Sequence, residues 1–198
     1  MMLAMRPSAI AVRGDDIWIA QQLDDGQGQI VRIDAPTGVI EAVVPVAAGI
    51  EGMLYARGRL WTVRGGPNRL TERDPTTLRA VNVVTIPGSS VGGLAFGAGA
   101  LWTTVPDQNQ LVRYQPDTEN RATVSIGARP AGVAVRGKLV WVAANGSSTV
   151  ERIAARSMRR VGDSIRVPLN PLAIAATEDA IWVTCVGENV VARVVAPS

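Results

Sequence analysis

Nine polar side chains in five short segments are the candidates for binding chemistry in this sequence: Asp24, Asp25, Arg64, Asp107, Gln108, Asn109, Asn145, Glu188 and Asn189. Carboxylate and amide oxygens are the ligands that calcium and magnesium prefer, so carboxylates from different segments could together hold such a cation. Asp24 and Asp25 are the best nucleus for a cation site, but an Asp-Asp-Gly-Gln-Gly run is also typical of a solvated turn. No Asp-x-Asp-x-Asp-Gly loop supports calcium binding. We therefore expect no metal ion and no other cofactor.

The sequence contains no histidine. Histidine is the side chain whose unperturbed pKa suits proton transfer near neutral pH. Its absence excludes histidine-ligated metal sites and Ser-His-Asp catalysis. The single cysteine, Cys185, has no sequence neighbour that would clearly lower its pKa, so we interpret it as a small buried hydrophobic residue. We therefore predict no catalytic residue in this chain.

Five tryptophans recur at a nearly constant spacing and define the elements that must position these side chains. Trp18, Trp61, Trp102, Trp141 and Trp182 are 43, 41, 39 and 41 residues apart. An aliphatic residue precedes each tryptophan, and a turn comes just before that residue. A fixed period near forty residues indicates a repeat architecture. We expect each tryptophan to pack in the core between neighbouring repeats.

Each repeat carries the signals of short strands and no helical periodicity. The first two runs are joined by a tight turn and predict a hairpin that contains the tryptophan. The third strands are expected at Gln29–Asp34, Leu70–Arg73, Leu111–Gln115, Thr149–Ile153 and Asn189–Val194. The fourth strands are expected at Ile40–Val46, Val81–Ile86, Ala122–Ile126 and Ser164–Val167. Four short antiparallel strands in about 41 residues are typical of a propeller blade, so we predict an all-β chain with the β-propeller fold.

We predict one propeller domain over residues 1–198, with five blades at residues 6–46, 47–86, 87–126, 127–167 and 168–198. The fifth repeat ends after its third strand. Residues 1–5 could pair with Asn189–Val194 and close a five-bladed ring. Alternatively, the chain is a fragment of a six- or seven-bladed propeller, whose exposed blade edges would favour association.

The nine candidate side chains lie in the expected loops between second and third strands: Gln21–Gly28, Arg64–Asn68, Pro106–Gln110, Asn145–Ser148 and Val186–Asn189. In a propeller these loops and the links between blades form one face, and we expect Glu51 and Arg129 of the links on it too. Divergent loops beside repeating strands suit a recognition surface. The alternative is that loop sequences drift freely.

A second recurring position lies eleven residues after each tryptophan, or fourteen in the first repeat, and holds Arg32, Glu72, Arg113, Arg152 and Arg193. Four arginines in equivalent positions could form a ring for an anionic ligand. We favour the other interpretation, in which these side chains lie over separate blades with their aliphatic stems packed.

Residues 126–135 read Ile-Gly-Ala-Arg-Pro-Ala-Gly-Val-Ala-Val, residues 139–145 read Leu-Val-Trp-Val-Ala-Ala-Asn, and residues 31–38 read Val-Arg-Ile-Asp-Ala-Pro-Thr-Gly. These segments resemble the repeats of the YVTN and streptogramin-lyase-like (virginiamycin B lyase-like) propellers. The resemblance implies the propeller fold over almost the whole chain. The best-known enzymes of that superfamily open a cyclic depsipeptide antibiotic with a histidine base and nearby magnesium. A chain without histidine lacks the base that this reaction uses.

Net charge and hydropathy limit the classes of partner that the chain could bind. The net charge is +3, and Lys138 is the single lysine. The arginines are spread along the chain except for Arg156, Arg159 and Arg160, so we predict no nucleic-acid binding. No apolar run approaches the roughly 18 residues of a membrane span. Residues 1–5 are too short for a secretory signal, so the chain is cytoplasmic as written, or extracytoplasmic if cut from an exported or membrane-anchored parent.

Together these features favour a non-catalytic propeller module that binds a ligand or a protein partner through the loops of one face. Such propellers occur as sensor domains of larger bacterial signalling proteins. A metal-assisted, lyase-like enzyme that uses carboxylates is the alternative, and a structural scaffold is a third interpretation.

Overall fold

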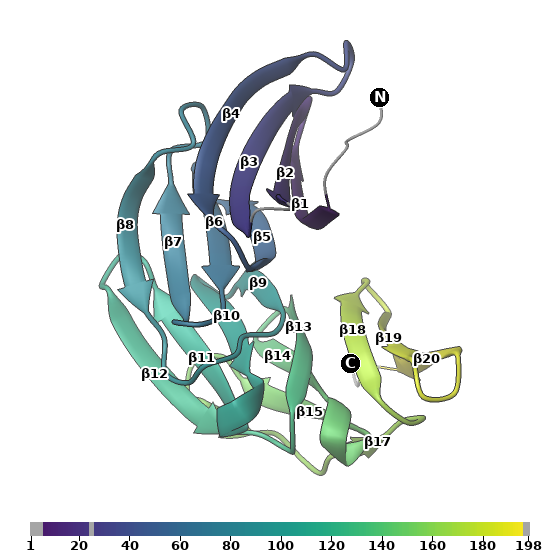
Figure 1. Cartoon of the computed structure of the whole chain (residues 1–198). Helices are drawn as coiled ribbons and strands as arrows, with labels where there is room; N and C mark the ends of the chain where they lie inside the picture. The colour runs from purple at the N-terminus through teal and green to yellow at the C-terminus, as the bar shows by residue number, and fades with distance from the viewer. Residues whose placement is uncertain (1–5, 24–25, 196–198) are drawn as a thin grey trace. The chain divides into compact units, whose positions relative to one another are not determined.

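The computed structural model describes residues 6–23 and 26–195, and these residues form antiparallel strands with two short 3₁₀ turns (Figure 1). The chain divides into two compact units, Met1–Ser90 and Val91–Ser198. Strands that follow one another in the sequence also neighbour one another in each sheet, except that β17 pairs with β15 and not with β16. The prediction of an all-β chain built from small antiparallel sheets is confirmed.

The first unit contains two four-stranded sheets. One sheet consists of β1 (Arg6–Arg13), β2 (Asp16–Gln22), β3 (Gln27–Asp34) and β4 (Ile40–Ala47). The other consists of β5 (Ile50–Ala56), β6 (Arg59–Arg64), β7 (Arg69–Arg73) and β8 (Ala80–Thr85). Their first strands, β1 and β5, contact each other. The outermost strands β4 and β8 alternate exposed and half-buried residues, as expected for strands with one face in water.

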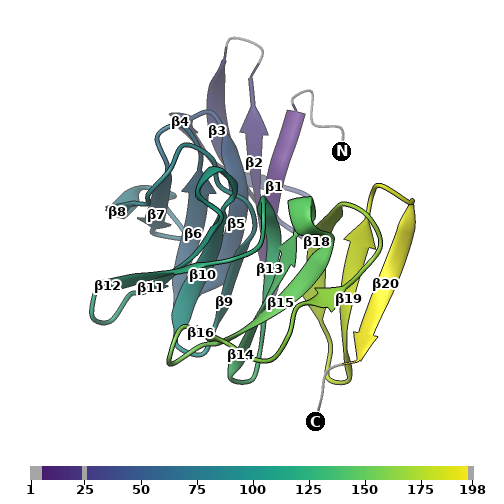
Figure 2. The same ribbon diagram turned by 90° about the horizontal axis from the view of Figure 1, so that it is seen from below.

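The second unit contains the other three sheets. The first consists of β9 (Leu94–Gly97), β10 (Ala100–Val105), β11 (Gln110–Gln115) and β12 (Asn120–Ser125), with η1 (Pro106–Gln108) after β10. The next consists of β13 (Pro130–Arg136), β14 (Leu139–Ala144), β15 (Thr149–Ala154), β16 (Arg159–Arg160) and β17 (Ile165–Arg166), with η2 (Asn145–Ser147) after β14. The last consists of β18 (Pro171–Ala176), β19 (Ala180–Cys185) and β20 (Val190–Val195). Strand β13 contacts both β9 and β18, and Figure 2 shows β13 beside β18.

The fourth strand of the middle sheet differs from the prediction. Instead of one strand at Ser164–Val167, two short segments, β16 and β17, pair with opposite ends of β15. The chain between them turns at Gly162, whose φ of +66° suits glycine. The buried carboxylate of Glu151 holds this region together. Its Oε1 accepts a hydrogen bond of 3.0 Å from the Gly127 N–H, and its Oε2 lies 2.8 Å from Nη2 of Arg160.

In the last sheet, β18, β19 and β20 are the strands present in the described part of the chain. The predicted pairing of residues 1–5 with this sheet involves residues that lie outside the described ranges. Strand β20 is the sheet's edge in Figure 2.

Four of the five tryptophans are core residues, as predicted. Trp18, Trp61, Trp102 and Trp141 are at most 1% exposed. The indole of Trp18 stacks on Tyr55 of the neighbouring sheet and donates a hydrogen bond to the Pro75 carbonyl there.

The expectation for the fifth tryptophan is wrong, because Trp182 is 40% exposed. Trp18, Trp102 and Trp141 belong to clusters that include residues of the sheet that follows their own. In the described part of the second unit, no sheet follows β18–β20. The indole of Trp182 is instead covered by the Arg193 guanidinium, 5.9 Å from the ring centroid.

Candidate functional site

Most of the predicted site residues that the structure describes lie in or beside the loops between second and third strands. In the second unit each loop ends on a left-handed residue seven positions after its tryptophan, namely Asn109, Ser148 and Asn189, with φ of 53°, 52° and 54°. Asparagine tolerates this region better than most residues because its short amide bonds locally. The three loops therefore share a left-handed residue at the same position despite their different sequences.

Hydrogen bonds join the loops of the second unit to the links between its sheets. The Asn109 Oδ1 accepts from the Arg129 N–H at 2.8 Å, and the Arg129 carbonyl accepts from the Asn145 N–H at 3.1 Å. The Asn145 Nδ2 donates to the Pro171 carbonyl at 3.1 Å. The Glu188 Oε1 accepts from the Leu169 N–H at 2.8 Å, two residues before Pro171. We call this set, Asn109, Arg129, Asn145, Leu169, Pro171 and Glu188, the loop–link strip.

The strip contains three predicted site residues, Asn109, Asn145 and Glu188. Hydrogen bonds connect Asn109 to Asn145 through Arg129, and Glu188 is bonded to Leu169, two residues before the Pro171 carbonyl that Asn145 contacts. Each of them, however, uses a polar side-chain atom to satisfy the backbone of a neighbouring link. Backbone N–H and C=O groups that leave regular structure need partners, and these side chains supply them. Their first role in the fold is therefore to fix the loops.

Three other predicted residues are exposed beside the strip. Asp107 and Gln108 form the short turn η1, and Asn189 ends the last loop. Asp107 and Gln108 immediately precede Asn109 of the strip, and Asn189 immediately follows Glu188. These exposed side chains extend the polar surface of the strip outward.

Arg64 lies in the first unit, at the end of β6. Its Nη1 is 3.4 Å from the Ala48 carbonyl, and it lines a cavity of about 580 Å³ whose other walls are Gly26, Gln27, Pro45, Val46, Ala47 and Ala48. Asp24 and Asp25 lie outside the described residues.

Glu51, in β5, was expected on the same face. Its carboxylate lies against the backbone of Gly65, the residue that follows Arg64, since a Cβ on Gly65 would come within 2.7 Å of the Glu51 Oε1. Burial raises the pKa of Glu51 above its ordinary value.

The sequence reasoning missed Asn68, which is 1% exposed. Its Nδ2 donates to the carbonyls of Pro87 and Ser90, at 2.8 and 3.0 Å, and so braces the first unit's loop. The signal that could have found it is the register, because Asn68 stands seven residues after Trp61, where Asn109 stands after Trp102.

The recurring third-strand positions form cross-strand pairs with the tryptophans: Trp18 with Arg32, Trp61 with Glu72, Trp102 with Arg113, Trp141 with Arg152, and Trp182 with Arg193. The Arg152 guanidinium lies 5.9 Å from the Trp141 ring centroid, the same distance that separates Arg193 from Trp182. Arg32 forms ion pairs with Asp16 and Glu41. Arg32, Arg152 and Arg193 therefore pack on their own sheets, as the favoured interpretation expected. Arg113 differs, because its Nη1 donates to the carbonyls of Ala155 and Arg156 in the following sheet.

The magnesium of the streptogramin lyases finds no fitting ligand set among the described residues, because no three Asp, Glu, His or Cys side chains gather there. The described residues also contain no helix long and apolar enough to cross a membrane.

Cys185 is fully buried at the end of β19. Burial raises the pKa of its thiol above the ordinary value, and the Glu188 carboxylate acts in the same direction. A buried, protonated thiol is a poor nucleophile. We expect the native protein to react with DTNB at neutral pH at least about tenfold more slowly than the protein in concentrated urea. Immediate labelling of the native protein, in proportion to its single thiol, would contradict this.

Comparisons with known proteins bear on the fold. No protein-family model matches the chain, and no curated protein matches its sequence. The structure of BamB from Moraxella catarrhalis is similar with a TM-score of 0.67 and 12% identity, over 89% of this chain and 57% of that one. U3-55K is similar with a TM-score of 0.80 and 14% identity, over 93% and 60%. A chain of the Mitotic Checkpoint Complex is similar with a TM-score of 0.83 and 12% identity, over 98% and 63%.

This chain thus spans about three fifths of the length of the solved structures that it matches. Identities of 12–14% show the fold alone. These similar structures are β-propellers, and the small antiparallel sheets described above correspond to blades. The chain has the β-propeller fold.

Proposed function

We propose that this chain is a non-catalytic propeller module that binds a protein partner through the loop–link strip and the exposed residues beside it. The observation that supports this most directly is the bracing of three successive loops by side chains of the strip. Loops held in one conformation lose little conformational entropy when a partner docks on them. The strip also presents exposed donors and acceptors in addition to the atoms that brace it.

The similarity to other propeller structures gives more general support for protein binding. One similar structure is that of a complex, the Mitotic Checkpoint Complex, in which a propeller chain is assembled with others. A partner for this chain would meet the exposed polar side chains of η1 and the last loop, Asp107, Gln108 and Asn189, and the cationic side chain of Arg129. This surface suits a polar partner segment with hydrogen-bonding groups.

The test compares two charge-introducing variants of the second unit. The double variant Gln108→Arg/Asn189→Arg changes exposed positions beside the strip, and Glu119→Arg changes an exposed position in the β11–β12 turn at the opposite end of the sheet. Proteins recovered on the immobilised wild-type chain, and identified by mass spectrometry, should be recovered equally on Glu119→Arg and lost from the double variant. Equal recovery on all three chains would contradict the proposal.

An enzymatic assay addresses the non-catalytic part of the proposal. Cyclic depsipeptides and lactones are incubated with the protein and added magnesium, and with alanine variants of Asp24, Asp25, Asp107 and Glu188. We expect no turnover by any of these chains. Turnover by the wild type that disappears in these variants would overturn the binding-module proposal in favour of a lyase-like enzyme.

We also propose that the repeats belong to the YVTN and streptogramin-lyase-like superfamily and form one propeller domain over residues 1–198, as a sensor module of a larger bacterial signalling protein. The repeat at residues 126–145 and the Val-Arg-Ile-Asp-Ala-Pro-Thr-Gly element support this. Sequencing the reading frame on both sides of the segment tests it. An adjoining kinase domain or membrane span supports the sensor role, and unrelated flanking domains contradict it.

A further inference from the structure

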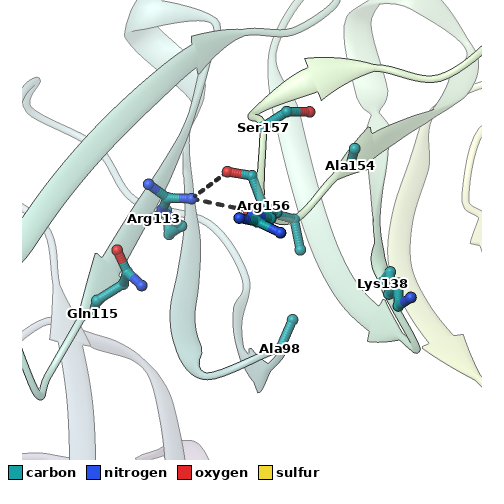
Figure 3. Close-up of a pocket in the computed structure, with 8 residues that line it drawn as sticks. Ala98, Arg113, Gln115, Lys138, Ala154, Arg156 and Ser157 are labelled. Atoms are coloured by element: carbon teal, nitrogen blue, oxygen red, sulfur yellow. Dashed lines mark hydrogen bonds between the residues drawn. The ribbon is translucent and has the colours of Figure 1, made fainter.

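A second candidate site lies in the second unit at the opposite end of the sheets from the loop–link strip. It is a cavity of about 910 Å³ between the β9–β12 sheet and the β13–β17 sheet, lined by Ala98, Arg113, Gln115, Lys138, Ala154, Ala155, Arg156 and Ser157 (Figure 3). Ala98 belongs to the β9–β10 turn, Lys138 to the β13–β14 turn, and Arg156 and Ser157 to the β15–β16 turn. This volume lies in the range of small-molecule sites.

The lining of this cavity carries charge of one sign. Arg113, Lys138 and Arg156 are cations, and none of the eight lining residues is acidic. Cations that share a cavity repel one another, and an anion bound among them would remove that repulsion. The cavity therefore favours a negatively charged ligand.

Arg113 differs from the arginines at equivalent positions in other sheets. Arg32 forms ion pairs with Asp16 and Glu41, and Arg193 forms one with Asp179. In the sheet of Arg113 the residues in register with Asp16 and Glu41 are Ala100 and Arg121. No carboxylate in the described part of the chain forms an ion pair with Arg113. Its positive charge is therefore not neutralised by any carboxylate of the described residues.

The Arg113 guanidinium is nevertheless held in place. Its Nη1 donates to the carbonyls of Ala155 and Arg156, at 3.0 and 3.1 Å, as Figure 3 shows. Its Nε is buried and has no hydrogen-bond partner. The Ala155 N–H in turn donates to the Lys138 carbonyl at 2.9 Å, which ties two walls of the cavity together. The guanidinium is thus positioned by the fold before any ligand binds, which lowers the entropic cost of binding.

The remaining lining combines small apolar residues with neutral polar ones. Ala98, Ala154 and Ala155 leave room and offer methyl groups, while Gln115 and Ser157 can donate hydrogen bonds. We propose that this cavity binds a small organic oxyanion, a carboxylate or a phosphate ester, with its charge among Arg113, Lys138 and Arg156 and its apolar part against the alanines. This site is separate from the surface proposed for the protein partner.

Lys138 provides a direct probe because it is the single lysine of the chain. Reductive methylation with ¹³C-formaldehyde keeps its charge and gives one lysine NMR signal besides that of the N-terminal amine. Benzoate, phenyl phosphate and inorganic phosphate are titrated separately, with benzyl alcohol as the neutral analogue. We expect the Lys138 signal to shift saturably with benzoate or phenyl phosphate, less with inorganic phosphate, and not with benzyl alcohol. The first two probes distinguish a carboxylate site from a phosphate site.

Calorimetry on variants tests which charges hold the probe. The double variant Lys138→Gln/Arg156→Gln removes two exposed cations of the cavity. The control Lys138→Gln/Arg166→Gln removes one cation of the cavity and one exposed arginine of β17 that does not line it. The first variant should bind the better probe about 100-fold more weakly than the wild type, and the second about tenfold, if each charge contributes one factor of ten. Equal weakening by the two variants, saturable binding of benzyl alcohol, or no shift of the Lys138 signal with any anion would overturn the proposal.

Discussion

Replacing Trp102 with alanine is expected to lower the free energy of unfolding of the second unit by about 3–5 kcal/mol. The indole is fully buried, and its Nε1 donates a hydrogen bond of 3.0 Å to the Gly97 carbonyl. It belongs to a cluster that includes Leu111 of its own sheet and Val133 and Val142 of the next. Alanine removes the contacts between two sheets and leaves a cavity that rigid strands cannot close.

Trp182→Ala is the matched control, since the same residue stands at the equivalent position of the last sheet but is 40% exposed. We expect it to cost about 1–2 kcal/mol, clearly less than Trp102→Ala, because the indole is already partly in water and its removal leaves no closed cavity between two sheets. Urea denaturation followed by circular dichroism measures both variants. If both variants lost the same free energy of unfolding, the loss would depend on the position in the repeat and not on packing against a following sheet.

This contrast shows how far the repeat in the sequence determines the structure. The period predicts that each tryptophan lies on a second strand, opposite a fixed third-strand residue, and all five registers agree with it. The period does not say whether another sheet covers the indole. Burial depends on the next repeat, so the reasoning that holds for Trp141 fails for Trp182.

The sequence indicates the loop positions of three candidate residues but not their hydrogen-bond partners. Asn109, Asn145 and Glu188 do lie in the loops at one end of the sheets, as the sequence indicates. A polar side chain that braces a backbone link and one that awaits a ligand look the same in a sequence, and only hydrogen-bond geometry separates them.

The cavity around Arg113 was harder to predict, because its lining comes from segments that meet only in the folded unit. One signal was present. Ala100 and Arg121 stand where another sheet has the acidic partners Asp16 and Glu41. When an arginine recurs in several sheets but its acidic partners do not, the arginine without partners has a different role from the others.

The first strands, where neighbouring sheets come closest, provide the second large effect. A Cβ on Gly132 would lie 2.6 Å from the Leu172 carbonyl oxygen and 2.9 Å from the Ile174 nitrogen, both in the backbone of β18. Gly93, the equivalent residue one sheet earlier, would meet the Val133 nitrogen at 2.9 Å. In the last sheet the same position is Ala173, which is exposed. In the second unit, glycine therefore stands where the first strand of a following sheet packs against the backbone, and alanine where no described sheet follows.

Gly132→Ala is accordingly expected to destabilise the second unit by about 3 kcal/mol, at the upper end for overpacking, because backbone atoms cannot move aside as a side chain can. Gly137→Ala is the control in the adjacent turn. Its Cβ would meet no atom within 4 Å, so its cost is limited to the strain of alanine at φ of +56°, about 1 kcal/mol. The difference in urea midpoint between the variants, at unchanged slope, measures the close approach of β13 to β18. A Gly132→Ala variant as stable as Gly137→Ala would mean that these strands can separate without loss, and that their contact does not hold the two sheets together.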